Sequence, residues 1–200
     1  MNRVLKLLSF IFILFISSNV FAQNEQLRLN WNDNATNEDG TEVERRLGTT
    51  GNFVPLFTIV GANIITYTDN NLLQATDYCY RVRAYNAGGQ SAYSNIACAI
   101  TPAILTVTKS GNGNGTVSSN PVGISCGTAC TNRFTGKSSV TLTAVASAGN
   151  VFTGWSGACT GITATCIVSM TSAQNVTANF SAILAPDGAP SNLVTTPVLP

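Results

Sequence analysis

A predicted β-hairpin near the middle of the chain constrains the fold more than any other stretch. Residues 78–85 place Tyr, Val and Ala on one side and Cys, Arg and Tyr on the other, the period-2 pattern of a strand with one buried face. Gly88-Gly89 then predicts a two-residue turn, because two glycines adopt positive φ without steric cost. A turn centred there places Cys79 opposite Cys98, and a cross-strand disulfide would lock the hairpin.

Six cysteines occur as three near pairs, and an even count in an oxidising compartment predicts disulfides. A hairpin turning near Ile162-Thr163 would bring the last two together. A zinc site formed by the last four cysteines is the alternative, and an export signal argues against it because secreted thiols are oxidised. The expected bridges are Cys79–Cys98, Cys126–Cys130 and Cys159–Cys166.

Residues 1–22 have the pattern of a secretory signal peptide. Arg3 and Lys6 precede an apolar run at 7–16, and Val20-Phe21-Ala22 is a small-residue cleavage pattern. The apolar run is shorter than the ~20 residues of a spanning helix, which disfavours the alternative of an uncleaved membrane anchor. We therefore expect cleavage after Ala22, no membrane span in the mature chain, and a secreted or cell-surface protein.

Charge is unevenly distributed along the chain. Residues 23–102 contain five basic and eight acidic side chains, whereas 103–182 contain three basic side chains and no acid. This difference predicts two domains of different origin. Three dispersed positive charges are too few for the many phosphate contacts of nucleic-acid binding, so that partner is excluded.

Residues 23–102 read as about seven short strands separated by turns, the pattern of a two-sheet sandwich. Trp31 in the first strand and Tyr78 in the hairpin are the expected core anchors. Pro102 ends the pattern, because proline interrupts a strand ladder, and 101–103 is predicted to be a short extended linker.

Several of these residues resemble the fibronectin type III family over 24–102. The resemblance implies an immunoglobulin-like sandwich. The cystine departs from the family pattern, and the alternation of the strand places Cys79 on the outward face, where its bridge would staple a surface. No Arg-Gly-Asp sequence is present, so integrin binding is not implied. The matching positions are Trp31, Val43-Glu44-Arg45, Tyr67-Thr68-Asp69, the corner Leu73, Thr76 and Tyr78, and Val82, Ala84 and Asn86.

Residues 103–182 form a second strand pattern without a helix signal. The run 139–145 is a strand with Val140, Leu142 and Ala144 inward. Residues 104–182 resemble a divergent bacterial B-repeat of the internalin type, which implies a small, mainly antiparallel and possibly β-grasp-like domain of secreted or surface proteins, with Trp155 as a core anchor. The motifs that carry this are Gly115-x-Val117, Cys126-Gly127-x-x-Cys130, 140–144, 152–157 and Val176-x-Ala178-x-Phe180.

Residues 183–200 hold four of the seven prolines and are predicted to be a flexible tail. Ala189-Pro190-Ser191-Asn192-Leu193 also resembles the opening of another fibronectin-type module. The tail is therefore either a tether or the start of a further module.

The composition argues against catalysis. The chain has no histidine, which removes the commonest general base and metal ligand. Acids in the loop 32–40 and on the strand 42–47 are interpreted as solvated charges, so no catalytic, cofactor-binding or metal residue is expected. A calcium site built from Asp33, Glu38 and Asp39 is the alternative.

The predicted function is that of a noncatalytic bacterial spacer, adhesion or ligand-presenting module. Its partner would be a protein or polysaccharide at or outside the cell surface. The alternative is a carbohydrate-binding accessory module of a polysaccharide-degrading system, for which Tyr85 and Tyr93 beside the hairpin turn are the candidate ligand contacts. The oligomeric state is not predicted.

Overall fold

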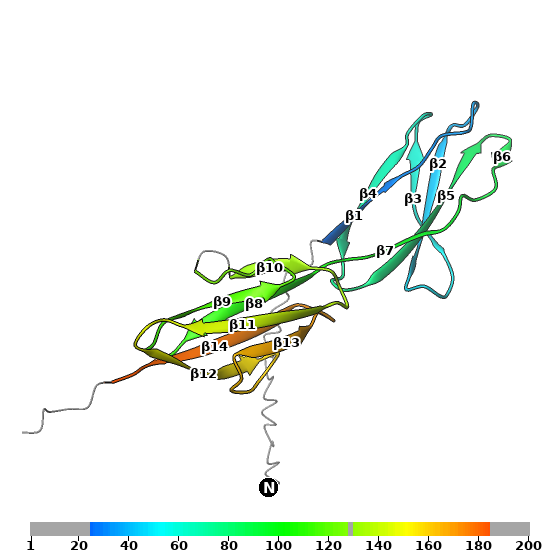
Figure 1. Cartoon of the computed structure of the whole chain (residues 1–200). Coiled ribbons are helices and arrows are strands. Elements are labelled where there is room, and N and C mark those ends of the chain that lie inside the picture. Colours follow the sequence, from blue (N-terminus) through cyan, green and yellow to red (C-terminus); the bar gives the residue numbers. More distant parts are fainter. Residues whose placement is uncertain (1–24, 128–129, 185–200) are drawn as a thin grey trace, which may run out of the picture.

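The computed structural model describes residues 25–127 and 130–184, except for the side chains of 57–60. All regular structure in these residues is β, arranged as an N-terminal body and a C-terminal body (Figure 1). The predicted signal peptide and most of the tail, 185–200, lie outside the described residues. No helix in the described part of the chain is long and apolar enough to cross a membrane.

The N-terminal body is an immunoglobulin-like sandwich of two sheets. One sheet has the order β1-β4; the other has the order β3-β2-β5, with β6 and β7 both paired to β5. All of these pairings are antiparallel. The strands are β1 (Glu25–Asn30), β2 (Gly40–Leu47), β3 (Val54–Val60), β4 (Thr66–Leu72), β5 (Asp77–Asn86), β6 (Gly89–Gln90) and β7 (Ala97–Ile100).

The core of this body is small and is closed by a polar contact between its two sheets. Tyr80 donates from Oη to Asp69 Oδ2 at 2.8 Å, and Arg45 Nη1 binds the same oxygen at 2.8 Å. Asp69 lies on β4 and is buried, so the pair of donors replaces the water that the carboxylate loses. Burial, together with the hydrogen bond to Asp69, raises the pKa of the Tyr80 hydroxyl.

The predicted tyrosine corner is present, with one change. The Leu73 amide donates to Tyr78 Oη at 3.0 Å, and Tyr78 is buried. The buried leucine of the motif is Leu72, however, whereas Leu73 is 47% exposed. Trp31, expected to be a core anchor, is only partly buried against the same cluster.

The hairpin turn lies one residue earlier than predicted. Asn86 pairs with Gly89, so the two turn residues are Ala87 and Gly88, and of the two glycines Gly89 alone has positive φ. The returning strand is irregular between β6 and β7 and contains two more residues there than the facing part of β5. This shift in register brings Cys98 opposite Cys79, as predicted.

The C-terminal body is a second sandwich. A sheet of order β10-β8-β14-β12 faces a sheet of order β13-β11-β9, and apolar residues of both form one core. Val140, Leu142 and Ala144 point inward as predicted. Two features were not predicted: strand β10 and the parallel pairing of β8 with β14. The strands are β8 (Ala103–Ser110), β9 (Gly115–Asn120), β10 (Thr131–Phe134), β11 (Ser139–Ala146), β12 (Asn150–Gly157), β13 (Thr165–Ser169) and β14 (Gln174–Ala182).

Two residues connect the bodies, at the position of the short extended linker expected from the sequence, and they are part of the packing. Thr101 has no exposed surface. Its Oγ1 donates to the Leu73 carbonyl at 2.5 Å and accepts from the Thr76 amide at 3.0 Å. The Ala75 amide donates to the Pro102 carbonyl at 3.2 Å. The connection is therefore held on one side by the 73–76 loop.

Gly136 lies against the backbone of the connection between the two bodies. A Cβ at this position would lie 2.4 Å from the Thr101 carbonyl oxygen and 2.6 Å from Ala75 Cα, both backbone atoms. Ala75 itself is buried in the core cluster of the C-terminal body, although it belongs to the β4–β5 loop. The absence of a side chain at 136 thus permits the contact between the bodies.

We expect Gly136→Ala to lower the free energy of unfolding by about 1–3 kcal/mol, because the backbone must shift to admit the methyl group. Urea unfolding followed by circular dichroism measures this. Gly127→Ala is the matched control, since a Cβ at that position would have no atom within 4 Å. Equal effects of the two substitutions would contradict the close approach at Gly136.

Candidate functional site

The outward face of the β2–β5 pair carries a ladder of opposite charges. Glu44 lies opposite Arg81 and Glu42 opposite Arg83, and each pair forms a salt bridge, with Nε–Oε2 distances of 2.7 Å. Gln90, on β6, adds a 3.1 Å hydrogen bond to Glu42. Cross-strand charge pairs of this kind contribute about 0.2–1 kcal/mol each to sheet stability. We call Glu42, Glu44, Arg81 and Arg83 the charge ladder.

Tyr93, a predicted ligand contact, is bound to this ladder. Its Oη donates to Glu44 Oε1 at 2.7 Å, and this bond is the main cause that raises the pKa of the Tyr93 hydroxyl. The Arg81 guanidinium lies 3.6 Å from the ring centroid and that of Arg83 lies 4.6 Å from it. These cations occupy the ring surface that would stack on a sugar.

Glu44 departs from the predicted solvated charge, because it is buried beneath Tyr93 and Arg81. Burial alone would raise the pKa of this carboxyl. Hydrogen bonds from Tyr93 and Arg81, together with the charges of Arg81 and Arg83, outweigh burial and lower the pKa. A carboxyl with a lowered pKa stays ionised at neutral pH, which is the opposite of what a general acid requires.

Tyr85, the second predicted contact, lies in different surroundings. It is half-exposed and borders a shallow cleft of about 400 Å³ near the hairpin turn, whose lining also includes Asn37, Glu38 and Gln90. Glu38 accepts from the Asn63 amide at 3.0 Å, and backbone hydrogen bonds lower the pKa of its carboxyl. Tyr85 is thus the one of the two tyrosines that lines a cleft.

The loop acids do not gather into a metal site in the described residues, where no group of three His, Cys, Asp or Glu side chains is placed to hold an ion. Asp33 instead accepts from the Ala35 amide at 3.0 Å, as in an Asx turn. Glu38 instead binds the Asn63 amide, as described above.

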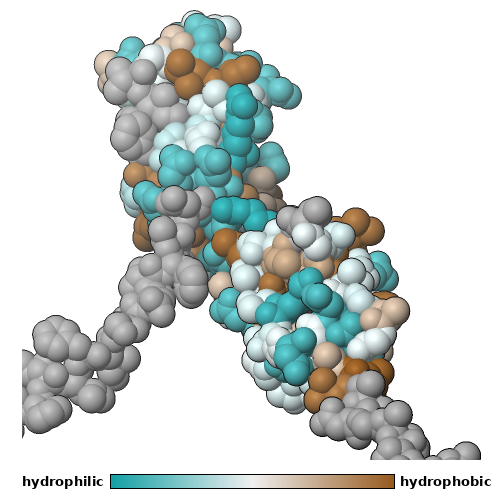
Figure 2. Space-filling model, turned by 90° about the vertical axis from the view of Figure 1, so that its left-hand side faces the viewer, coloured by the Kyte–Doolittle hydropathy of each residue, from teal (hydrophilic) through white to brown (hydrophobic). Residues whose placement is uncertain are grey.

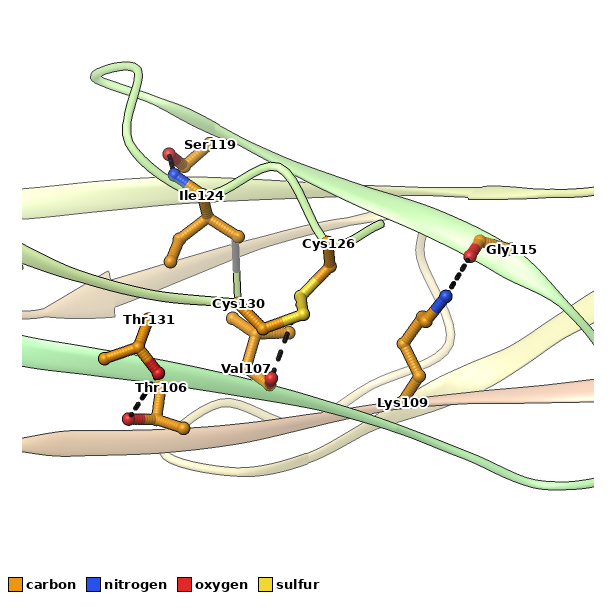
Figure 3. The surroundings of a disulfide bond; sticks show 9 residues. All are labelled: Thr106, Val107, Lys109, Gly115, Ser119, Ile124, Cys126, Cys130 and Thr131. Atoms are coloured by element: carbon orange, nitrogen blue, oxygen red, sulfur yellow. Dashed lines mark hydrogen bonds between the residues drawn. A yellow bond between two sulfur atoms is a disulfide. The ribbon is translucent and has the colours of Figure 1, made fainter. Parts of the chain in front are cut away.

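The cysteines are joined as Cys79–Cys98, Cys126–Cys130 and Cys159–Cys166. Cys126 Sγ also lies 3.7 Å from the Val107 carbonyl, beside Thr106 and Thr131 on β8 and β10 (Figure 3). In the same view Lys109 Nζ donates to the Gly115 carbonyl at 3.0 Å. All six cysteines are consumed in bridges, which leaves no thiol for a zinc site.

Cys79 was predicted to lie on the outward face, where its bridge would staple a surface. It is absent from the apolar core cluster, yet it has no exposed surface, whereas Cys98 is exposed. Arg46, opposite Cys79, and Arg81 both place their guanidinium groups over the Phe53 ring, at 4.7 and 4.4 Å. These side chains form a second layer above the sheet, which accounts for the burial.

Trp155, in the C-terminal body, is a core residue as predicted. It is 5% exposed, its Nε1 donates to the Thr163 carbonyl at 2.9 Å, and its ring centroid lies 5.0 Å from that of Phe152. Phe152 in turn meets Phe180 edge-on at 5.5 Å. The indole is therefore unavailable as a sugar-stacking surface.

Two ion pairs connect the bodies across their junction, and sequence reasoning did not find them. Arg133 on β10 binds Glu25 on β1, and Lys137 binds Asp77 at the start of β5. The Glu25 side chain is 2% exposed, whereas Arg133 is 52% exposed. The Gln74 side chain adds a 3.0 Å bond from the Ile104 amide. The one signal in the sequence was the acid surplus of 23–102 beside the acid-free 103–182.

Comparison with known proteins finds one family model that matches the C-terminal body. Residues 105–184 match the model of the family described as the divergent InlB B-repeat domain. None of the curated proteins compared matches the chain. A solved structure that is similar is that of the chicken CNTN1 FN1–FN3 domains, at 13% identity and a TM-score of 0.33. The match covers 78% of this chain and 53% of that one, so the chain spans about half the length of that structure.

We expect Glu44→Gln to lower the free energy of unfolding at neutral pH by about 1–3 kcal/mol, because charge-assisted bonds are lost. A lowered folded-state pKa stabilises the protein above the unfolded value of 4.5, and the effect disappears as pH falls through the folded-state pKa. The stability difference between wild type and variant should therefore shrink below about pH 4.5. Urea unfolding across the acid range measures it; a difference that does not change with pH would contradict the ionised, buried Glu44.

Removal of Arg133 should cost more than removal of Lys137. Arg133→Met leaves a buried carboxylate without its cation, and we expect a loss of about 2–4 kcal/mol. Lys137→Met breaks a pair whose two partners are both partly exposed, and about 0–1 kcal/mol is expected. Thermal unfolding of both variants gives the comparison. The reverse order would show that Glu25 is not buried in solution.

Proposed function

We propose that this chain is an exported, noncatalytic module pair that acts as a rigid spacer at or outside the bacterial cell surface. The modules are a fibronectin type III-like sandwich, 23–102, and a divergent B-repeat-like domain, 103–182. The observation that carries the proposal is the buried, hydrogen-bonded connection at Thr101 and Pro102.

Neighbouring domains usually move relative to one another. A connection that is buried and hydrogen-bonded restricts this motion, and a restricted connection is what a spacer needs. Here the two linking residues bond to the 73–76 loop, Ala75 packs into the core of the next body, and two ion pairs bridge the junction. The bodies lie one after the other, as Figures 1 and 2 show. A stiff, elongated pair keeps whatever is attached to its two ends apart.

An extracellular location fits the chemistry. Three disulfides persist in oxidising compartments, and the matched B-repeat family is consistent with a protein outside the cell or on its surface. The two kinds of β domain are typically noncatalytic, and the chain has no histidine. The predicted signal peptide, 1–22, would supply the export step.

The side chains also bear on the choice between spacer and sugar binder. A carbohydrate-binding face needs exposed rings, and the Tyr93 ring is covered by arginines while Trp155 is buried. Hydrophobic residues on the face shown in Figure 2 form small separate groups, with hydrophilic residues between them. Any recognition of a protein or polysaccharide is then expected on loops, such as those that line the cleft at Tyr85.

Rigidity can be measured on the mature chain by residual dipolar couplings. We expect alignment tensors fitted separately to β1–β7 and to β8–β14 to agree, as they do for one rigid body. Insertion of Gly-Ser-Gly between Thr101 and Pro102 is the control and should make the tensors differ. Different tensors in the wild type would overturn the spacer proposal. Retention of the wild type on an insoluble polysaccharide, abolished by the soluble sugar, would favour the carbohydrate-binding alternative.

A further inference from the structure

A groove of about 780 Å³ opens along one side of the N-terminal body. Its floor is apolar and comes from both sheets: Leu27, Leu29 and Trp31 on the β1 side, and Val82 on β5. All four are only partly buried, although they pack against the core cluster. The groove is therefore a place where this sandwich is left incompletely covered.

Two unpaired strand edges border the groove. Strand β1 pairs with β4 alone, and β7 pairs with β5 alone, among the described residues. The β1 side of the groove is lined by residues 27–32 and the β7 side by 97–99. Ala97, Cys98 and Ala99 are exposed. An open edge presents free N–H and C=O groups that bind a further strand, and an apolar floor receives its alternate side chains. The groove thus has the form of a site for one missing strand.

The chain carries a segment suited to that site. Ser191–Thr196, with the sequence SNLVTT, lies between Pro190 and Pro197, which mark where strand pairing must stop. It is six residues long, as is β1. It is rich in β-branched residues, carries no charge, and offers Leu193 to one face and Val194 to the other. Its first three residues also belong to the stretch 189–193 that resembles the opening of a fibronectin-type module.

Chain length indicates that the segment comes from a second copy. Strand β14 runs parallel to β8, away from the junction. Gln174 of β14 lies beside Leu105 near the start of β8, and Ala182 lies eight residues further along. At about 3.3 Å per residue, Ala182 is therefore about 26 Å farther from the junction than Leu105. A strand added antiparallel to β1, like every other pairing in this body, must enter at the far end of β1. That adds about 20 Å, and the total requires about 14 residues. A tail of its own chain would reach the entry point only near Pro197.

We propose that Ser191–Thr196 of one copy pairs antiparallel with β1 in the groove of a second copy. Each copy then offers a donor strand at one end and an open groove at the other, so the contact is heterologous and produces linear head-to-tail chains. The predicted cleavage after Ala22 would leave Gln23 and Asn24 before β1. Assembly of this kind would extend a spacer without any further protein.

The test is sedimentation velocity of the oxidised mature chain over a wide range of concentration. We expect the mass to rise from that of one chain to that of two and more. Leu193→Pro/Val194→Pro removes N–H groups pointing to both sides of the donor strand and should hold the protein at one chain. Asp187→Pro/Gly188→Pro places the same number of prolines outside the segment and should assemble like the wild type. Both pairs of substitutions follow β14, the last strand that the structure describes.

A groove variant completes the test. Ala97→Arg places a long cationic side chain in the groove from an exposed position and should also hold the protein at one chain, with an unchanged circular dichroism spectrum. An equal mixture of the tail and groove variants should form a complex of two chains and no larger species, because one intact tail meets one intact groove. A wild type that stays at one chain throughout, or a groove or tail variant that assembles like the wild type, would overturn the proposal.

Discussion

The structure depends on a single buried threonine more than on any other side chain. Thr101 uses its hydroxyl to satisfy a carbonyl and an amide of the 73–76 loop, and its backbone amide donates to the Thr76 carbonyl at 3.0 Å. A buried backbone group without a partner is costly, so these bonds fix the loop and the connection together. The fixed loop then places Ala75 in the core of the next body. The connection between the two sandwiches is thereby packed and hydrogen-bonded.

Charge supports the same junction. The C-terminal body has three cations and no acid, and two of the cations, Arg133 and Lys137, pair with acids of the N-terminal body. The third, Lys109, donates to the carbonyl of Gly115 within its own body. The uneven charge that suggested separate domains is therefore also a complementary pair of surfaces. Because Glu25 is buried, its pairing with Arg133 matters more than that of the exposed pair.

On the outward face of the β2–β5 pair, the charged and aromatic side chains already bind one another. The charge ladder satisfies its own members, Tyr93 is bonded to Glu44 and covered by arginines, and Phe53 carries two guanidinium groups. The opposite situation holds along the groove, where apolar side chains are only partly buried and, among the residues that the structure describes, two strand edges are unpaired. The contrast directs attention away from the aromatic residues and toward the edge of the sandwich as the surface with unused binding capacity.

The sequence by itself determined the β class, most strand positions, the inward set Val140, Leu142 and Ala144, and the cysteine pairing, because these depend on period-2 alternation and on partners close in the chain. Only the tertiary structure decided the burial of Glu44 and Cys79, the half-exposure of Trp31, the added strand β10 and the packed junction. Each of these depends on which residues cover the face of a sheet or pair with its edge strand. Arg133 and Glu25, for instance, are 108 residues apart. Alternation shows which way a side chain points, but burial is set by distant residues that cover it, and local patterns carry no record of them.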